Sequence, residues 1–155
     1  MRTKKQPYLT SAQLAEALEE SQKLGRPTEQ VCKYFKLIAQ HLLGDSRYRN
    51  YPKDMQEDMV SAALLKCAKN IKNYKKERAA SCFNYYTKCT EHAFWETLGK
   101  HYKHMNMVRQ MTLDFADMLE SYSPSLAKQI RDNQICIERA KDKLTFNKEK
   151  ANEHD

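Results

Sequence analysis

Glycine and proline are scarce in this chain, with three and four occurrences in 155 residues. Hairpin turns and strand ends depend on these two residues, so their scarcity favours helices over strands. No stretch approaches the roughly 18 consecutive apolar residues of a membrane-spanning helix. The N-terminal segment 1–7 is basic but lacks the apolar run of a signal peptide. We therefore expect an all-α, soluble intracellular protein without a membrane partner.

The usual signatures of metal sites and enzymes are also missing. The five cysteines include no Cys-x-x-Cys pair, and the one local group of metal-binding residue types (Cys82, Cys89 and His92) matches no zinc spacing. No cysteine has neighbours that would activate it as a nucleophile. Paired carboxylates, a Gly-rich phosphate loop and a nucleophile elbow are absent as well. We predict reduced structural thiols, no metal, no cofactor and no enzymatic activity.

Positive charge is in excess. Lysine and arginine number 27 against 20 aspartate and glutamate residues, which gives a net charge of +7. Such a balance favours polyanionic partners, although many basic proteins bind none. The position of the charges therefore carries more information than their sum.

The glycines and prolines mostly separate segments with helical periodicity. Thr10 and Gln13 form the pattern of a capping box, and Gly99 marks a kink or an early helix end. We expect helices over 10–25, 28–44, 52–73, 81–103, 113–122 and 123–146. The predicted organisation is a compact domain of about five to six helices over 1–122, a C-terminal helix over 123–146 and a disordered polar tail over 147–155.

The segment 58–104 is the most informative part of the chain. A helix with an acidic start ends near Tyr74, a charged connector follows, and the next helix alternates rings with amide and basic side chains. Rings interleaved with cations suit a surface that stacks on unpaired bases and neutralises the phosphates between them.

The order of these features resembles region 2 of bacterial RNA polymerase sigma factors, and most of all the short late-transcription sigma factors of large tailed phages. Asp58-Met59 through Tyr74 resembles the first helix of that region, and Phe83-Asn84-Tyr85-Tyr86 resembles its Phe-x-x-Tyr motif. The phage late subset is matched further by Asp58-Met59-Val60-Ser61, Lys72-Asn73-Tyr74, Thr87 and Ala93-Phe94. The resemblance covers about residues 30 to 104.

The resemblance implies two functional surfaces and an all-α sigma region 2-like fold. The first surface would dock on the clamp helices of the largest subunit of bacterial core RNA polymerase. Its expected residues are Asp54, Glu57, Asp58, Ser61, Ala62, Leu65 and Lys69. Glycines of the general docking motif are replaced here by Ala63 and Lys66.

The second implied surface would capture the melted non-template strand of the −10 promoter element. Its expected residues are Tyr74, Lys75, Lys76, Arg78, Phe83, Tyr85, Tyr86, Lys88, Cys89, Thr90, His92, Trp95, Lys100 and Lys103. Cys89 and Thr90 stand where housekeeping sigma factors carry a tryptophan pair, so recognition at the upstream edge of the element must differ.

The resemblance also implies a DNA sliding clamp, bound through Leu144 and Phe146, and a late coactivator as further partners. The site of action would be the cytoplasm of an infected bacterial host, at phage late promoters.

Periodicity alone gives a plainer interpretation of part of this pattern. Phe83, Tyr86 and Phe94 share a helix face and are as readily core residues, whereas Tyr85 and Trp95 leave that face and should be exposed. Two other functions remain open: a nonspecific helical nucleic-acid-binding protein, and a helical adaptor that binds only protein.

Overall fold

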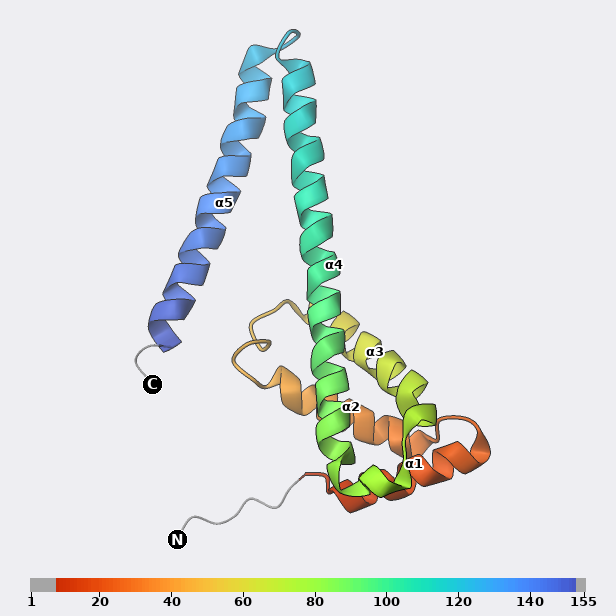
Figure 1. Ribbon diagram of the computed structural model, residues 1–155. Helices are drawn as coiled ribbons and strands as arrows, with labels where there is room; N and C mark the ends of the chain where they lie inside the picture. The colour runs from red at the N-terminus through yellow and green to blue at the C-terminus, as the bar shows by residue number, and fades with distance from the viewer. Residues whose placement is uncertain (1–7, 153–155) are drawn as a thin grey trace. The chain divides into compact units, whose positions relative to one another are not determined.

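The computed structural model contains helices and no strand in the part of the chain that it describes, which confirms the all-α class (Figure 1). It describes the backbone of residues 8–152 and the side chains of residues 8–139. The chain divides into two units, Met1–Lys100 and His101–Asp155. None of the described helices is both long and apolar enough to cross a membrane.

The first helix of unit 1, α1 (Ser11–Leu24), has the predicted ends. The Thr10 hydroxyl accepts a hydrogen bond from the Gln13 backbone N–H at 3.3 Å, and Gln13 Oε1 accepts one from the Thr10 N–H at 3.1 Å. This pair is the capping box that the sequence indicated. The helix ends at Gly25, whose φ of 66° lies in the left-handed region that glycine adopts without steric cost.

Three further elements lead to the aromatic helix. Helix α2 (Glu29–Leu43) is capped by Thr28, and α3 (Lys53–Asn70) follows Pro52 directly. The helix expected to reach residue 73 ends three residues earlier as an α-helix and continues as a 3₁₀ turn, η1 (Ile71–Asn73). A second 3₁₀ segment, η2 (Lys76–Ser81), connects it to α4 (Cys82–Leu119).

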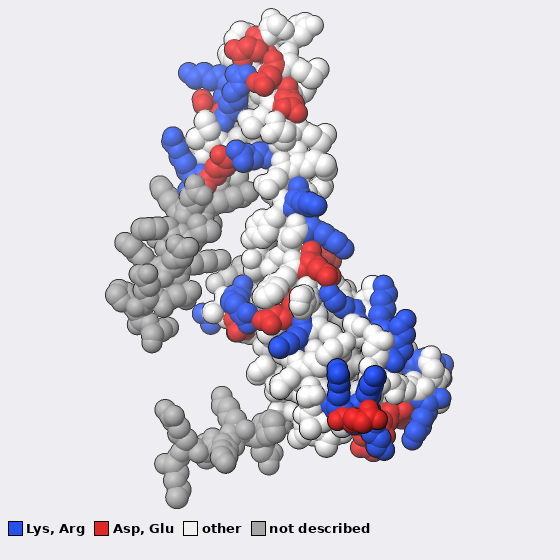
Figure 2. All heavy atoms as spheres, in the orientation of Figure 1, with Lys and Arg blue, Asp and Glu red and all other residues white. Residues whose placement is uncertain are grey.

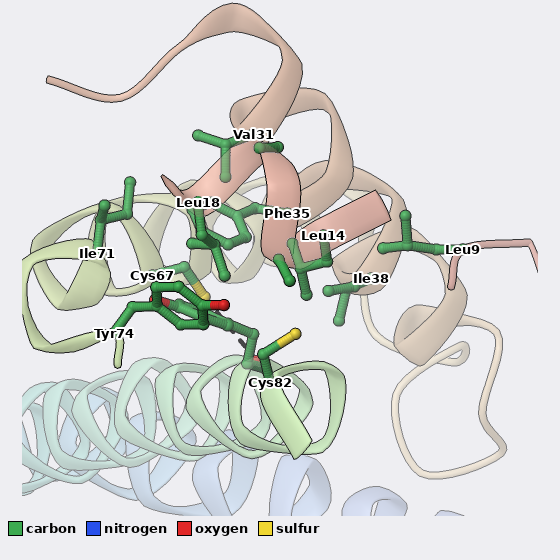
Figure 3. Close-up of a cluster of buried hydrophobic side chains, with 13 residues drawn as sticks. Leu9, Leu14, Leu18, Val31, Phe35, Ile38, Cys67, Ile71, Tyr74 and Cys82 are labelled. Carbon is green, nitrogen blue, oxygen red and sulfur yellow. Dashed lines mark hydrogen bonds between the residues drawn. The ribbon is translucent and has the colours of Figure 1, made fainter. Parts of the chain in front are cut away.

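Two apolar clusters hold unit 1 together. In the first, Leu14 and Leu18 of α1 and Phe35 of α2 lie over Cys67 of α3 (Figure 3), and Tyr86 of α4 belongs to the same cluster. The Phe35 and Tyr86 rings are 4.9 Å apart, centroid to centroid. The second cluster joins α2, α3 and α4 around these buried residues: Ala39, Tyr48, Met55, Met59, Ala63, Ala93, Phe94 and Leu98. The N-terminal part of α4 is therefore a core helix of unit 1.

Helix α4 differs from the expectation of two helices over 81–103 and 113–122. It is continuous over 38 residues and contains Gly99, around which a Cβ would meet nothing within 4 Å. One glycine inside a helix costs only about 1 kcal/mol relative to alanine, and no proline or further glycine occurs between residues 100 and 119. The boundary between the two compact units falls inside α4, at residue 100.

Unit 2 pairs the C-terminal part of α4 with α5 (Pro124–Asn152). Ala116 and Ala127 are fully buried, and small residues of this kind allow two helices to approach closely. Arg131 forms ion pairs with Asp117 at 2.7 Å and with Glu120 at 2.6 Å. The expected tail at 147–155 lies beyond the residues whose side chains are described.

Large apolar side chains of unit 2 remain exposed. Val108, Met111, Phe115 and Met118 are 42%, 63%, 54% and 71% exposed. Their spacing of three, four and three residues places them on one side of α4. We call these four residues the apolar stripe.

Candidate nucleic-acid interface

The outer side of α3 carries the residues predicted to dock on polymerase. Met55, Met59, Ala63 and Cys67 form the buried side of this helix. The predicted residues, at 100° per residue, fall on the opposite side. Six of them are exposed: Asp54, Glu57, Asp58, Ser61, Leu65 and Lys69. The result is an accessible face with an acidic N-terminal end and an exposed leucine near its middle.

Ala62 is the exception on this face. It is half-buried and packs against the second core cluster. Its side chain therefore lies at the edge of the candidate docking face, and enlarging it would disturb the core.

The connector between α3 and α4 is held against α1 by one glutamine. Gln22 Nε2 donates hydrogen bonds to the carbonyl oxygens of Ile71 and Tyr74, both at 2.8 Å. Exposed cations follow at once, namely Lys75, Lys76 and Arg78. Lys76 also pairs with Glu19 at 3.5 Å.

Three residues predicted to contact DNA are buried. Tyr86 and Thr90 are fully buried, and Tyr74 is 9% exposed. The Tyr86 hydroxyl donates to the Asn70 carbonyl oxygen at 3.3 Å, and the Thr90 hydroxyl donates to the Tyr86 carbonyl oxygen at 2.9 Å. The side of α4 that bears Tyr86 and Thr90 packs on the core, so both residues contribute to packing, and Tyr86 also borders the hollow described next.

A hollow of about 220 Å³ opens beside the connector. We call it the aromatic hollow, and its lining includes Tyr74, Lys75, Arg78, Cys82, Tyr85 and Tyr86. The Tyr74 hydroxyl is buried and has no hydrogen-bond partner among the described side chains and backbone. Rings with two cations beside them suit a planar base that carries a phosphate.

The exposed side of α4 in unit 1 carries a second set of rings. Tyr85, Lys88, His92 and Trp95 follow one another at spacings of three, four and three residues, so they share one side of the helix. We call these four residues the α4 stripe. Tyr85 is 44% and Trp95 53% exposed, which confirms their predicted exposure.

The other residues predicted to contact DNA or the sliding clamp divide into three groups. Lys100 is exposed in unit 1, and Lys103 is exposed but belongs to unit 2. Phe83 and Cys89 are half-buried and pack on the first core cluster. Leu144 and Phe146, the predicted clamp contacts, lie outside the residues whose side chains are described.

Carboxylates near the α4 stripe are paired. Glu91 accepts from Arg47 at 2.7 Å, and Glu96 accepts from Lys66 at 2.7 Å. The hydrogen bond from Lys66 holds the pKa of Glu96 below its usual value, so this carboxylate stays ionised and tied to its partner. These pairings leave Lys88 as an exposed cation between the rings.

Two side chains that position the candidate site, those of Tyr48 and Gln22, were not predicted from the sequence. Trp95 Nε1 donates to the Tyr48 hydroxyl, 47 residues away, at 2.8 Å, and the two hydrogen bonds of Gln22 span 49 and 52 residues. Tyr48 and Gln22 lie in polar surroundings in the sequence, with no pattern that marks them. Only the tertiary contacts distinguish them from neighbouring surface residues.

No three His, Cys, Asp or Glu side chains among residues 8–139 converge in a way that would hold a metal ion. Cys82, from the group with metal-binding residue types, is buried and lies 3.4 Å from the Ser11 carbonyl oxygen, to which its thiol donates. Burial raises the pKa of both Cys82 and Cys89, which favours the neutral thiol over the thiolate that a metal requires.

No family model, no curated protein and no solved structure matches this chain.

Proposed function

We propose that this protein is an RNA polymerase sigma factor that directs a host core polymerase to phage late promoters. The outer side of α3 docks on the clamp helices of the largest subunit. The aromatic hollow and the α4 stripe capture the melted non-template strand of the −10 element. A sliding clamp and a late coactivator complete the set of expected partners.

One observation carries the strand-capture proposal. Accessible rings and cations gather on one unit, with Tyr85 lining the aromatic hollow and also belonging to the α4 stripe. Rings stack only on bases that have left the duplex, and each stacked base contributes about 1–3 kcal/mol. Such a surface therefore favours a melted strand over intact duplex DNA.

The docking proposal rests on the separation of the two surfaces within unit 1. The α3 face presents Asp54, Asp58 and Leu65 to solvent, on the side of the helix opposite its buried residues. The proposed partner of this face, the clamp helices of core polymerase, comes from the resemblance of about residues 30 to 104 to sigma factor region 2. A protein that must hold polymerase and DNA at once requires two such separate surfaces.

The decisive experiment is transcription by a reconstituted holoenzyme. The full chain is mixed with bacterial core polymerase, the complex is isolated, and opening of an A·T-rich −10 element is followed by permanganate footprinting and runoff transcription. We expect Tyr85→Ala and Trp95→Ala to retain polymerase binding and to reduce open complexes at least tenfold. Lys36→Ala, an exposed lysine on α2, serves as the control.

A template with a pre-melted −10 bubble separates two causes of the defect. Variants that fail only in melting regain activity on this template, whereas variants that have lost the grip on the bases do not. If both ring variants open promoters as well as wild type, the strand-capture surface is misplaced. If the chain does not bind core polymerase at all, the sigma assignment fails.

A protein-only adaptor is the second candidate, because the apolar stripe of unit 2 is accessible. Exposed methionines and aromatics on a helix are common at surfaces that bind other helices. Binding to a protein partner without any binding to single-stranded DNA would favour this function. DNA binding with a steep salt dependence and no effect of melting would instead favour a nonspecific nucleic-acid-binding protein.

A further inference from the structure

Unit 1 contains a second and larger hollow, of about 700 Å³, where the C-terminal ends of α1 and α3 meet. We call it the cationic hollow. Arg26, Lys69 and Lys72 line it, together with Pro27, Ala68 and Ile71. No carboxylate is among its lining residues. Figure 2 shows lysine and arginine side chains gathered on the side of unit 1 where α3 lies.

The favourable interaction of cations with the C-terminal end of a helix explains only one of the three cations in the hollow. A lysine in the last turn of a helix is favourable in itself because it faces the negative end of the helix dipole, and Lys69 has that position. Arg26 follows the C-cap Gly25, and Lys72 lies in η1, so both cations stand beyond the last turn of the α-helices. None of the three has an ion-pair partner within the described part of the chain. Three unpaired cations around one concavity favour an anion between them.

The floor of the hollow indicates what kind of anion it would accept. Pro27, Ala68 and Ile71 supply small and aliphatic surface, and no aromatic ring lines the hollow. A sugar can lie on such a surface, whereas a base would find nothing to stack on. The aromatic hollow has the opposite character, with three tyrosines in its lining.

Consecutive residues of the connector line the two hollows. Ile71 and Lys72 line the cationic hollow, and the next residues, Tyr74 and Lys75 among them, line the aromatic hollow. Gln22 lines the cationic hollow and also binds the carbonyl oxygens of Ile71 and Tyr74. One glutamine therefore fixes the strip of backbone that separates the two hollows.

We propose that the cationic hollow binds the sugar–phosphate backbone of the same nucleic-acid strand whose base enters the aromatic hollow. Arg26 and Lys72 neutralise its phosphates, and the aliphatic floor supports its sugars. This inference rests on the DNA-binding part of the proposed function. It adds a backbone site at the ends of α1 and α3, outside the α4 stripe.

The test measures binding of the full chain to a labelled 20-nucleotide single strand by fluorescence anisotropy over a series of salt concentrations. Each phosphate contact to a single strand contributes about 0.7 to the slope of log K against log salt. Arg26→Gln combined with Lys72→Gln should therefore lower the slope by about 1.4. The matched control is Lys36→Gln combined with Lys53→Gln, which removes the same charge from exposed residues outside both hollows and should leave the slope nearly unchanged.

A strand with abasic sites assigns the effect to the backbone. On this strand the loss caused by Arg26→Gln with Lys72→Gln should persist, whereas the effect of Tyr85→Ala should disappear. Circular dichroism verifies that the helices of each variant are intact. Competition with tripolyphosphate tests the alternative source of phosphate and should require a concentration at least a hundredfold above that of the oligonucleotide.

The outcomes separate this inference from the proposed function. If wild type binds the strand and both double variants lower the slope equally, the cationic hollow is not a backbone site and the rest of the DNA-binding proposal stands. Competition by tripolyphosphate at the concentration of the oligonucleotide would show a free-polyphosphate site and overturn the inference. If wild type binds no single strand under any salt condition, the DNA-binding proposal and this inference fall together.

Discussion

Trp95 donates a hydrogen bond from its indole nitrogen to the hydroxyl of Tyr48 at 2.8 Å. Tyr48 is 2% exposed, and its ring meets the Phe94 ring edge-on at 5.2 Å. The indole of Trp95 is thus half-exposed and yet tied to a core residue. A ring held in this way loses less conformational freedom when a base stacks on it.

Trp95 also provides a built-in reporter, because it is the only tryptophan in the chain. We expect oligo(dT) single strands to quench its fluorescence, since a stacked base contacts the indole directly. Tyr48→Phe removes the hydrogen-bond acceptor, so the free energy of unfolding should fall by about 1 kcal/mol. Half-maximal quenching should then require a higher DNA concentration, because the indole is held less firmly. Fluorescence titration of both proteins measures this. Unchanged emission at a DNA concentration that saturates binding would place Trp95 outside the interface.

Docking on polymerase should depend on the exposed side of α3. Asp58→Lys combined with Leu65→Asp reverses one charge and removes one apolar contact, and both residues are exposed, so the fold should be retained. We expect at least a tenfold loss of affinity for core polymerase, because a docking interface concentrates its energy in a few such residues. Co-elution in gel filtration gives the measurement, with Lys36→Glu as the control. Equal co-elution of both variants would remove α3 from the polymerase interface.

Gln22 should control the order of the connector. Gln22→Ala deletes two hydrogen bonds to carbonyl oxygens of residues 71 and 74, which should lower the free energy of unfolding by about 1–2 kcal/mol. The amides of residues 71–78 should then exchange faster with solvent. Hydrogen exchange measured by mass spectrometry checks this against Gln30→Ala, which removes an exposed glutamine from α2. Identical exchange in the two variants would mean that the connector is ordered by other contacts.

Alkaline pH should destabilise the fold through Cys67. Burial raises the pKa of this thiol to about 12, against about 8.5 in an unfolded chain. Between these values the unfolded state releases the proton and the folded state keeps it. The free energy of unfolding should therefore fall as the pH rises from about 8.5 towards 12.

Urea titrations at several alkaline pH values measure this effect. Cys67→Ala should show a shallower decline than wild type, apart from a constant loss caused by the cavity. N-ethylmaleimide should label the exposed Cys136 in the native protein and the buried Cys67 only after unfolding. An equal decline in wild type and variant would remove Cys67 as a source of the pH dependence.

Helix ends and exposed helix faces could be predicted from residues that are only a few positions apart in the sequence. The capping box of Thr10 and Gln13 and the end of α1 at Gly25 follow from short-range hydrogen bonding and from the backbone preferences of glycine. The exposure of Tyr85 and Trp95 followed from helical periodicity, because residues of one face recur every three or four positions.

Only the tertiary structure decided which other residues could form a surface. Tyr86 and Thr90 belong to the aromatic motif by sequence, yet they lie in the core because their side of α4 packs on α3. The continuity of α4 through Gly99 was equally undetermined, since one glycine costs less than the rest of a long helix provides.

The two hollows and the anchoring of Trp95 by Tyr48 arise from groups that are 47 to 52 residues apart or meet from separate helices. Periodicity within one helix indicates which side of it is apolar, and the sequence by itself therefore determined the all-α class, the ends of α1 and the exposure of Tyr85 and Trp95. Helical periodicity in the sequence does not specify the distance between side chains of different helices. Those distances are set by packing in the core, and packing brought consecutive residues of the connector into the lining of an aromatic hollow and of a cationic one.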